Sequence, residues 1–258
     1  MLNPINQGKV NTTINSTGIA TVEFGHPLSN SLPGKVLQKL ADTITELGVN
    51  DDVKVIMIKS IGDRAFCAGA SFDELISIKD SNAGKIFFSG FAKVINACRK
   101  CPKFIVGRVQ GKTVGGGVGL ASSFDYCLAT KYADIKLSEL AIGIGPFVVG
   151  PAVERKMGLS AMSQLTINAT EWCSAKWAKE KGLYAEIYDD IEELDEQIDV
   201  LLKKLANSNP ESMKLLKSFF WKGTENWDSL LEDRASISGE LVLSDFTVKA
   251  INSFKNKK

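Results

Sequence analysis

Two short segments of glycine and alanine carry backbone groups that could bind a developing negative charge. They are residues 68–70 (Ala-Gly-Ala) and residues 115–117 (Gly-Gly-Gly). Each is predicted to join a strand to a helix, where the first N–H groups lack intrahelical partners and carry partial positive charge. If the segments meet in the fold, N–H groups from both could bind one carbonyl oxygen and form an oxyanion hole. The alternative is that the glycines only permit tight packing of a helix against a strand.

The same glycines do not match the common nucleotide-binding motifs. Gly111 precedes lysine and threonine, as in a phosphate-binding loop, but three residues separate it from Gly107 where that loop needs four. Counting from Gly115, the sixth position holds Leu120, so the glycine spacing of a dinucleotide-binding turn is absent too. No nucleotide cofactor is therefore predicted from these segments.

Strand-like runs alternate with helical runs before the chain becomes mostly helical, and this order places both glycine segments at strand-to-helix junctions. Strands are predicted at residues 19–24, 53–59, 104–109, 126–129 and 135–137. Helices are predicted at residues 33–47, 72–78 and 83–98, after the glycines to about residue 124, and over most of the chain from about residue 149. The pattern predicts an α/β fold with a core at residues 1–195 and a helical C-terminal region at residues 196–258.

The bulk composition is that of an ordinary globular protein. Of 258 residues, 44% are hydrophobic and 24% are charged, and the formal net charge is +1. This balance provides no field that favours nucleic acid, and no stretch approaches the ~18 consecutive apolar residues of a membrane span. Residues 1–10 do not resemble a secretory signal. We therefore expect a cytoplasmic protein with neither a nucleic-acid nor a membrane partner.

The cysteines favour reduced thiols over disulfides or a metal site. Their number, five, is odd, and the chain is long enough to fold without covalent staples. Cys98 and Cys101 form a Cys-x-x-Cys pair, but no second pair accompanies it, and the single histidine, His26, lies in another segment. Because structural zinc takes four such ligands, no metal site is predicted.

Two longer motifs carry a resemblance to a known family. Residues 65–70 (Ala-Phe-Cys-Ala-Gly-Ala) and 109–120 (Val-Gln-Gly-Lys-Thr-Val-Gly-Gly-Gly-Val-Gly-Leu) resemble the oxyanion-hole segments of the crotonase superfamily, the enoyl-CoA hydratase/isomerase family. The agreement runs from about Ile19 to a final helix ending near Phe254. The resemblance implies a spiral of ββα units with a C-terminal helical trimerisation region, and a homotrimer or homohexamer. It also implies an acyl-CoA thioester substrate, with coenzyme A as part of the substrate and no separate cofactor.

The resemblance also assigns the residues of the oxyanion hole. It implies that Ala70 and Gly116 supply the two N–H donors. The neighbours expected to contact the substrate are Ala68, Gly69, Gly115, Gly117 and Gly119. Ser71 stands where the family usually has aspartate, but a serine can still cap the following helix.

An enolate in this hole needs a group that moves a proton beside it. Family hydratases usually carry two glutamates, one three residues after the middle glycine and one about twenty residues later. In this chain the first position is Gly119 and the second is Glu139, which is therefore predicted to transfer the proton. One carboxylate suffices to move a proton from Cα to Cγ, so double-bond isomerisation is favoured over hydration. Asp73 and Glu74 are the candidates to replace the missing carboxylate.

Two alternative functions stay open. One is a 2-enoyl-CoA hydratase, a lyase of fatty-acid or branched-chain acyl-CoA breakdown. The other is a relative that binds acyl-CoA without catalysis.

The remaining expectations concern contacts with the substrate's two ends. Phe147 and Val148 follow Glu139 in an apolar loop, where they could line the acyl pocket or pack in the core. By resemblance, Phe246 and Lys255 are the nearest matches to residues that contact CoA from the last helices. His26 lies on a turn where the family often places a basic residue near CoA.

Overall fold

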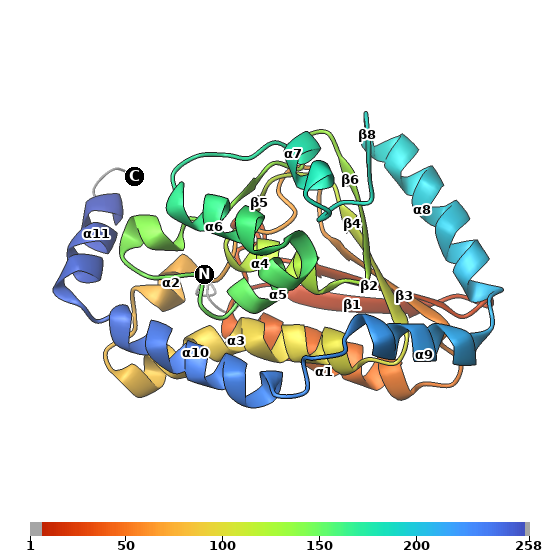
Figure 1. The fold of residues 1–258 in the computed structure, drawn as a ribbon, viewed down its shortest axis with the longest axis horizontal. Helices are drawn as coiled ribbons and strands as arrows, with labels where there is room; N and C mark the ends of the chain where they lie inside the picture. The colour runs from red at the N-terminus through yellow and green to blue at the C-terminus, as the bar shows by residue number, and fades with distance from the viewer. Residues whose placement is uncertain (1–6, 256–258) are drawn as a thin grey trace.

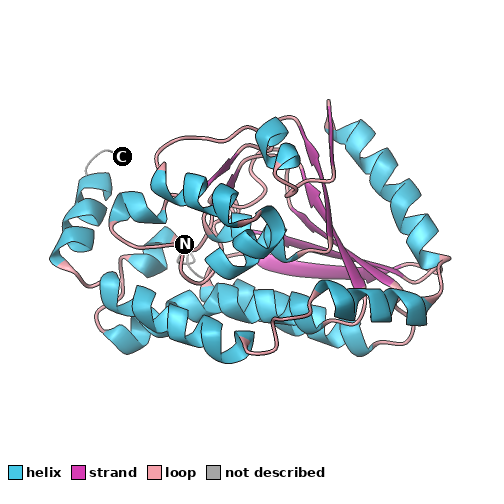
Figure 2. Ribbon diagram, in the orientation of Figure 1, coloured by secondary structure: helices cyan, strands magenta, loops and turns pink. Residues whose placement is uncertain are grey.

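A six-stranded sheet forms the centre of the structure, a computed structural model that describes residues 7–255 (Figure 1, Figure 2). The strand order is β1-β2-β3-β4-β6-β8, with β1 antiparallel to β2 and the other neighbouring pairs parallel. The strands are β1 (Lys9–Ile14), β2 (Ile19–Gly25), β3 (Val55–Ser60), β4 (Phe104–Val109), β6 (Tyr126–Thr130) and β8 (Glu186–Tyr188). Because the parallel strands share a direction, the segments that follow them gather at one edge of the sheet.

Short strands after the main strands build a second, smaller layer. β5 (Thr113–Val114) pairs in parallel with β7 (Ile135–Lys136), and a bridge joins Cys67 to Thr113 of β5. β4, β5 and helix α4 (Gly116–Ser123) therefore form one ββα unit. The chain from β3 through Cys67 to the next helices forms the unit before it. The predicted α/β spiral of ββα units is confirmed.

Helices cover both faces of the sheet. They are α1 (Gly34–Val49), α2 (Phe72–Leu75), α3 (Ser81–Lys100), the 3-10 helix η2 (Glu139–Ile142), α5 (Gly150–Met157), α6 (Leu159–Ile167), α7 (Ala175–Glu180), α8 (Ile191–Ala206), α9 (Pro210–Phe220), α10 (Trp227–Leu241) and α11 (Asp245–Lys255). Side chains alternate along a strand, so on β3 Ile56 joins the main core with Leu40 of α1, whereas Val55 packs against Leu194 of α8. The main core thus lies between the sheet and helix α1.

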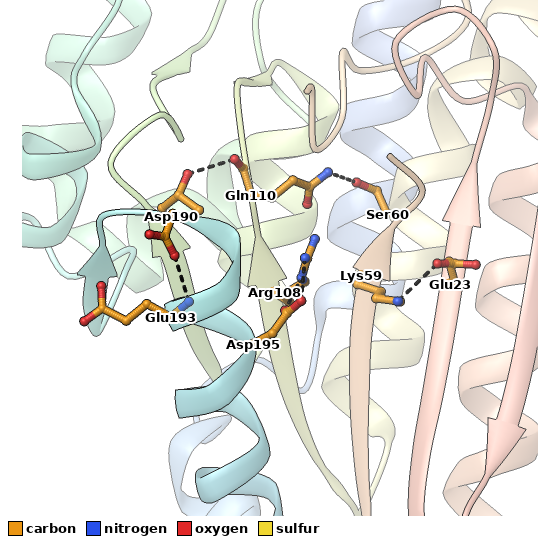
Figure 3. Close-up of polar contacts among 9 residues, drawn as sticks. Glu23, Lys59, Ser60, Arg108, Gln110, Asp190, Glu193 and Asp195 are labelled. Atoms are coloured by element: carbon orange, nitrogen blue, oxygen red, sulfur yellow. Dashed lines mark hydrogen bonds and ion pairs between the residues drawn. The ribbon is translucent and has the colours of Figure 1, made fainter. Parts of the chain in front are cut away.

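Helix α8 is tied to the sheet by an ion pair. Nε and Nη2 of Arg108 on β4 donate to the two carboxylate oxygens of Asp195 at 2.7 and 2.9 Å (Figure 3). The Arg108 side chain is almost fully buried, so this paired geometry also satisfies a buried cation. The division predicted at residue 195 falls inside α8, which packs on the sheet.

The C-terminal helices return to the core of the same chain. α10 lies along α3 (Figure 1), and at the crossing a Cβ built on Gly84 would lie 2.7 Å from the Cα of Gly239. Only glycine at both positions lets the two backbones approach this closely. α10 is therefore part of the wall around the first helices.

Besides the short elements β5 and η2, which were not predicted, the structure differs from the predicted elements at three places. β1 has no apolar face, since all its residues except Val10 are exposed, and a strand without alternation gives no periodic signal. β8, which was not predicted, is only three residues long. The helix predicted at residues 72–78 ends as α2 at Leu75.

Two further properties concern membranes and metals. No helix within residues 7–255 combines the length and apolarity needed to cross a membrane. Across the same residues, no three histidine, cysteine, aspartate or glutamate side chains are grouped as metal ligands would be.

Candidate functional site

The first glycine segment leaves the N–H of Ala70 unused. Leu32 N–H donates to the carbonyl of Gly69 at 2.8 Å, and Ser71 N–H donates to the carbonyl of Leu32 at 3.0 Å. The Ser31 hydroxyl donates a hydrogen bond to the carbonyl of Ala70 at 2.8 Å. These bonds orient the peptide, and the Ala70 N–H has no acceptor among the residues described.

Ser71 has the capping role predicted for it. Its side chain accepts from the N–H of Glu74 at 3.4 Å, in the first turn of α2. The departure from the family's usual aspartate therefore leaves the strand-to-helix junction intact.

The second segment needs its glycines for backbone conformation and for close packing. Gly115 has φ +54°, a region that residues with a Cβ rarely adopt, and its N–H donates to the carbonyl of Lys136 at 2.8 Å. A Cβ on Gly116 would lie 2.3 Å from the ring of Phe91, and one on Gly117 would lie 2.6 Å from the carbonyl oxygen of Cys67. Gly116 is the first residue of α4, so its N–H has no carbonyl one turn earlier to bind.

The two segments lie side by side. Val114 N–H donates to the carbonyl of Cys67 at 2.9 Å, which extends the small sheet across both segments. A Cβ on Gly69 would lie only 3.6 Å from the nitrogen of Gly116. Ala70 and Gly116 line the same cavity. Free N–H groups from two strand-to-helix junctions thus share one wall, which is the arrangement an oxyanion hole requires.

Glu139 lies next to this wall, at the start of η2. Its Oε1 lies 3.0 Å from where a Cβ on Gly115 would stand. Its Oε2 is buried and has no hydrogen-bond partner among the described residues. Burial raises the pKa of the Glu139 carboxyl from its usual value of 4.5 to about 7, because the charged form loses hydration. A carboxyl with this pKa can both take up and release a proton near neutral pH.

The hole and Glu139 open into a cavity of about 660 Å³. Most of its wall is apolar. The predicted site residues that line it are Ala68, Gly69, Ala70, Gly115, Gly116, Glu139, Phe147 and Val148. A neighbouring hollow of about 500 Å³ includes His26 and shares Ser29 with the cavity.

Four predicted site residues do not line the cavity. Gly117 packs on Cys67, as described above, and Gly119 packs on Val149, whose Cβ and Cγ1 lie 2.4 Å from where a Cβ on Gly119 would stand. Phe246 is 66% exposed and lies beside Gly143. Lys255 ends α11, and its side chain is outside the described part of the structure.

The two candidate replacement carboxylates have different surroundings. The Glu74 carboxylate accepts from the N–H of Gly34 at 2.8 Å, so it stabilises the start of α1. Asp73 instead lines the cavity. Of the two, Asp73 is placed to meet a ligand.

Several lining residues were not predicted from the sequence. Phe87, Phe88 and Phe91 of α3 line the cavity, as does Ser238 of α10. The three phenylalanines follow the spacing of one helix face, which indicates a buried face but not what it is buried against. Val149, which fills the space in front of Gly119, gave no signal beyond an apolar loop.

Comparison with known proteins identifies the family. The family model described as enoyl-CoA hydratase/isomerase matches residues 14–257. A probable enoyl-CoA hydratase of Bacillus subtilis is 26% identical over 242 residues, which are 93% of each chain. A peroxisomal Delta(3,5)-Delta(2,4)-dienoyl-CoA isomerase of Arabidopsis thaliana is 24% identical over 81% of this chain and 80% of its own. The crystal structure of an enoyl-CoA hydratase from Bacillus halodurans has the same fold, with a TM-score of 0.86, 19% identity, and coverage of 95% of this chain and 99% of that one. The chain therefore belongs to the enoyl-CoA hydratase/isomerase family, within the crotonase superfamily that its glycine segments resemble.

Proposed function

We propose that this enzyme isomerises a 3-enoyl-CoA thioester to the conjugated 2-enoyl-CoA thioester. The N–H groups of Ala70 and Gly116 bind the thioester oxygen, and Glu139 carries a proton from C2 to C4. The observation on which this rests is a single carboxylate, Glu139, whose buried Oε2 has no partner among the described residues, beside two free N–H groups, with Val149 packed where a second glutamate would begin.

The proton transfer balances with one carboxylate. Ionised Glu139 removes a proton from C2, and the electron pair moves onto the thioester oxygen, where two N–H donors stabilise the dienolate. The neutral carboxylic acid then returns the proton to C4, the double bond settles between C2 and C3, and the carboxylate is restored. Because its pKa is raised to about 7, Glu139 is a stronger base than an exposed glutamate. No cofactor beyond the CoA of the substrate takes part.

Hydration is disfavoured by the surroundings of Gly119. Adding water to a 2-enoyl thioester is easiest with one group that activates water and another that protonates C2. Val149 supports an apolar surface at the place where the family's first glutamate would be. Among the described residues, the atoms nearest to this position belong to Val149, which cannot hold a water by hydrogen bonding.

A side-by-side assay tests the proposal. The enzyme is expected to convert 3-hexenoyl-CoA to 2-hexenoyl-CoA much faster than it hydrates 2-hexenoyl-CoA. Glu139→Gln should lose at least about a hundredfold in kcat, the lower range for general acid–base catalysis, while still binding hexanoyl-CoA. Exposed Glu154, on α5, provides the matched control, Glu154→Gln. Faster hydration than isomerisation, or normal turnover by Glu139→Gln, would refute the assignment.

A second candidate function is hydration with Asp73 as the second carboxylate, because Asp73 lines the same cavity. In that case Asp73→Asn would abolish water addition. If wild-type enzyme shows no water addition, this candidate is rejected.

The proposal also covers CoA binding, cellular location and assembly. CoA would extend from the hole past Ser29 toward the hollow with His26, and Phe246 and Lys255 would contact it from α11. We propose a cytoplasmic homotrimer or homohexamer, supported by a row of exposed apolar side chains on α9: Leu215, Leu216, Phe219 and Phe220. The core at residues 1–195 would carry the catalytic groups, and the helical region at residues 196–258 would add part of the cavity wall and the assembly surface.

A further inference from the structure

The cavity wall continues away from the hole along one face of α3. The ring of Phe91 lies against Gly116, since a Cβ at that glycine would come within 2.3 Å of it. Phe87 and Phe88 lie one helical turn earlier on the same cavity wall. Their rings meet edge to face with centroids 5.0 Å apart. An acyl chain that leaves the hole along this wall therefore meets aromatic surface.

A packed apolar cluster, called the closing cluster below, contributes Phe72, Leu75, Phe87, Phe88, Ile142 and Ile144 to the cavity wall. Its buried members are Leu75, Ile144, Val242 and Ile251, and Phe72, Ile76, Ile78, Phe87, Phe88, Ile142 and Leu243 pack against them. They come from α2 and the turn after it, α3, η2 and the loop after it, the turn after α10, and α11, which gather at one end of the molecule (Figure 1). Val242, Leu243 and Ile251 of the cluster do not line the cavity, so the cavity ends against the cluster, and this sets a limit on the length of the acyl chain.

The length of acyl chain that reaches the phenylalanine pair can be estimated from the geometry of α3. Four residues separate Phe91 from Phe87, or about 6 Å along α3 at 1.5 Å per residue. An extended chain advances about 1.2 Å per bond, as the backbone reach of three bonds per residue implies. About five bonds therefore separate a carbonyl beside Phe91 from a methyl group beside Phe87. A chain of six carbons reaches the phenylalanine pair, which packs in the closing cluster, and a chain of eight extends about 2.4 Å further.

The charges on the wall exclude an acidic chain end. Within residues 7–255, no lysine, arginine or histidine lines this cavity. Its two ionisable side chains are the carboxylates Asp73 and Glu139. A carboxylate at the end of the acyl chain would lose its hydration here without gaining a cation.

We infer that the acyl subsite selects an uncharged chain of about six to eight carbons. The inference rests on the proposed function in one respect, that the thioester carbonyl lies between Ala70 and Gly116. Phe88 and the closing cluster then determine which chain length binds most tightly.

Binding of saturated acyl-CoA esters tests this without any turnover. Titration calorimetry with butanoyl-, hexanoyl-, octanoyl- and tetradecanoyl-CoA should show affinity rising about fourfold per methylene up to octanoyl-CoA, from about 0.8 kcal/mol per buried methylene. Tetradecanoyl-CoA should bind no more tightly than octanoyl-CoA. Hexanedioyl-CoA, which differs from hexanoyl-CoA by its terminal carboxylate, should bind at least about tenfold more weakly. Equal affinity across the series, or hexanedioyl-CoA binding as tightly as hexanoyl-CoA, would overturn the inference.

Substitutions on one helix assign the effect to the wall. Phe88→Leu and Phe88→Ala should reduce the advantage of hexanoyl- over butanoyl-CoA from about 15-fold to less than about fourfold. Ile86→Ala is the matched control, since Ile86 lies on the same helix and is 65% exposed. The ratio is measured within each variant, so partial unfolding does not mimic the effect. An unchanged ratio in both Phe88 variants would overturn the assignment.

The two proposals fail in different ways. A rising affinity series with no isomerisation of 3-hexenoyl-CoA would keep the acyl subsite and reject the reaction. Isomerisation with equal rates for 3-butenoyl-, 3-hexenoyl- and 3-octenoyl-CoA would keep the reaction and reject the subsite.

Discussion

The contact between Gly119 and Val149 allows a sharp prediction about stability and about the missing carboxylate. An alanine at position 119 would place its Cβ 2.4 Å from both Cβ and Cγ1 of Val149, and 3.3 Å from its Cα. The clash involves atoms next to the backbone, so rotation of the valine side chain cannot relieve it. We expect Gly119→Ala to destabilise the protein toward the upper end of the about 1–3 kcal/mol typical of overpacking. In an open helix the same change would stabilise by about 0.5–1 kcal/mol.

Urea unfolding followed by circular dichroism measures this cost. A loss of about 2 kcal/mol should lower the Tm by about 4–8 °C in a chain of this size. Val149→Gly removes the clashing atoms, so the double variant should be more stable than the sum of the single effects by about 1–2 kcal/mol. Gly34→Ala is the control, because its Cβ would have no neighbour closer than 3.6 Å.

The same contact determines what a restored glutamate can do. Gly119→Glu alone should not raise water addition, because Val149 lies between position 119 and the cavity. Gly119→Glu combined with Val149→Gly opens the path, and only there should hydration of 2-hexenoyl-CoA increase. A stable Gly119→Ala variant, or hydration gained by Gly119→Glu alone, would refute this account of the site.

Four further outcomes are expected, two from Glu139 and two from buried contacts. Isomerase kcat/KM should fall below about pH 7, since Glu139 must be ionised to act as base and burial raises its pKa to about 7; a pH profile that is flat down to pH 5 would contradict this. The same raised pKa means that folding loses stability as pH rises from 4.5 to about 7, so Glu139→Gln should melt at a higher temperature than wild type at pH 8, with little difference at pH 4. Lys217→Met should cost about 3–5 kcal/mol in urea unfolding, because the Lys217 Nζ lies 2.8 Å from Asp125 and their side chains are only 3% and 5% exposed; a loss below about 1 kcal/mol would show that the pair is not truly desolvated. Gly84→Ala should force α3 and α10 apart at Gly239, which would appear as a lower Tm and weaker hexanoyl-CoA binding, whereas unchanged values would mean that the helices adjust freely.

The sequence predicted what depends on local backbone requirements. Few local structures other than a strand-to-helix junction require several small residues together. Residues 68–70 and 115–117 could therefore be placed at junctions before any contact was known. The cap at Ser71 was predictable for the same reason, because a side chain and an N–H three residues later form it.

The remaining features depend on which segments meet. Phe91 was predictable as buried, but not as lying against Gly116, because nothing local to α3 encodes that contact. Val149 and Gly119 are thirty residues apart, and they pack together at the position where family hydratases usually carry their first glutamate. The two-residue strand β5 is too short for periodicity to indicate it, although it pairs with the predicted strand β7 and bridges to Cys67 of the first hole segment.

The close crossing of α3 and α10 has a consequence for cooperation between subunits. Since α10 folds back on its own chain and contributes Ser238, the acyl wall, the hole and Glu139 all come from one polypeptide. Each copy in an assembly is then an autonomous catalyst. Mixed oligomers of wild-type and Glu139→Gln chains should therefore show activity in simple proportion to the wild-type fraction, and two different inactive chains should not complement one another.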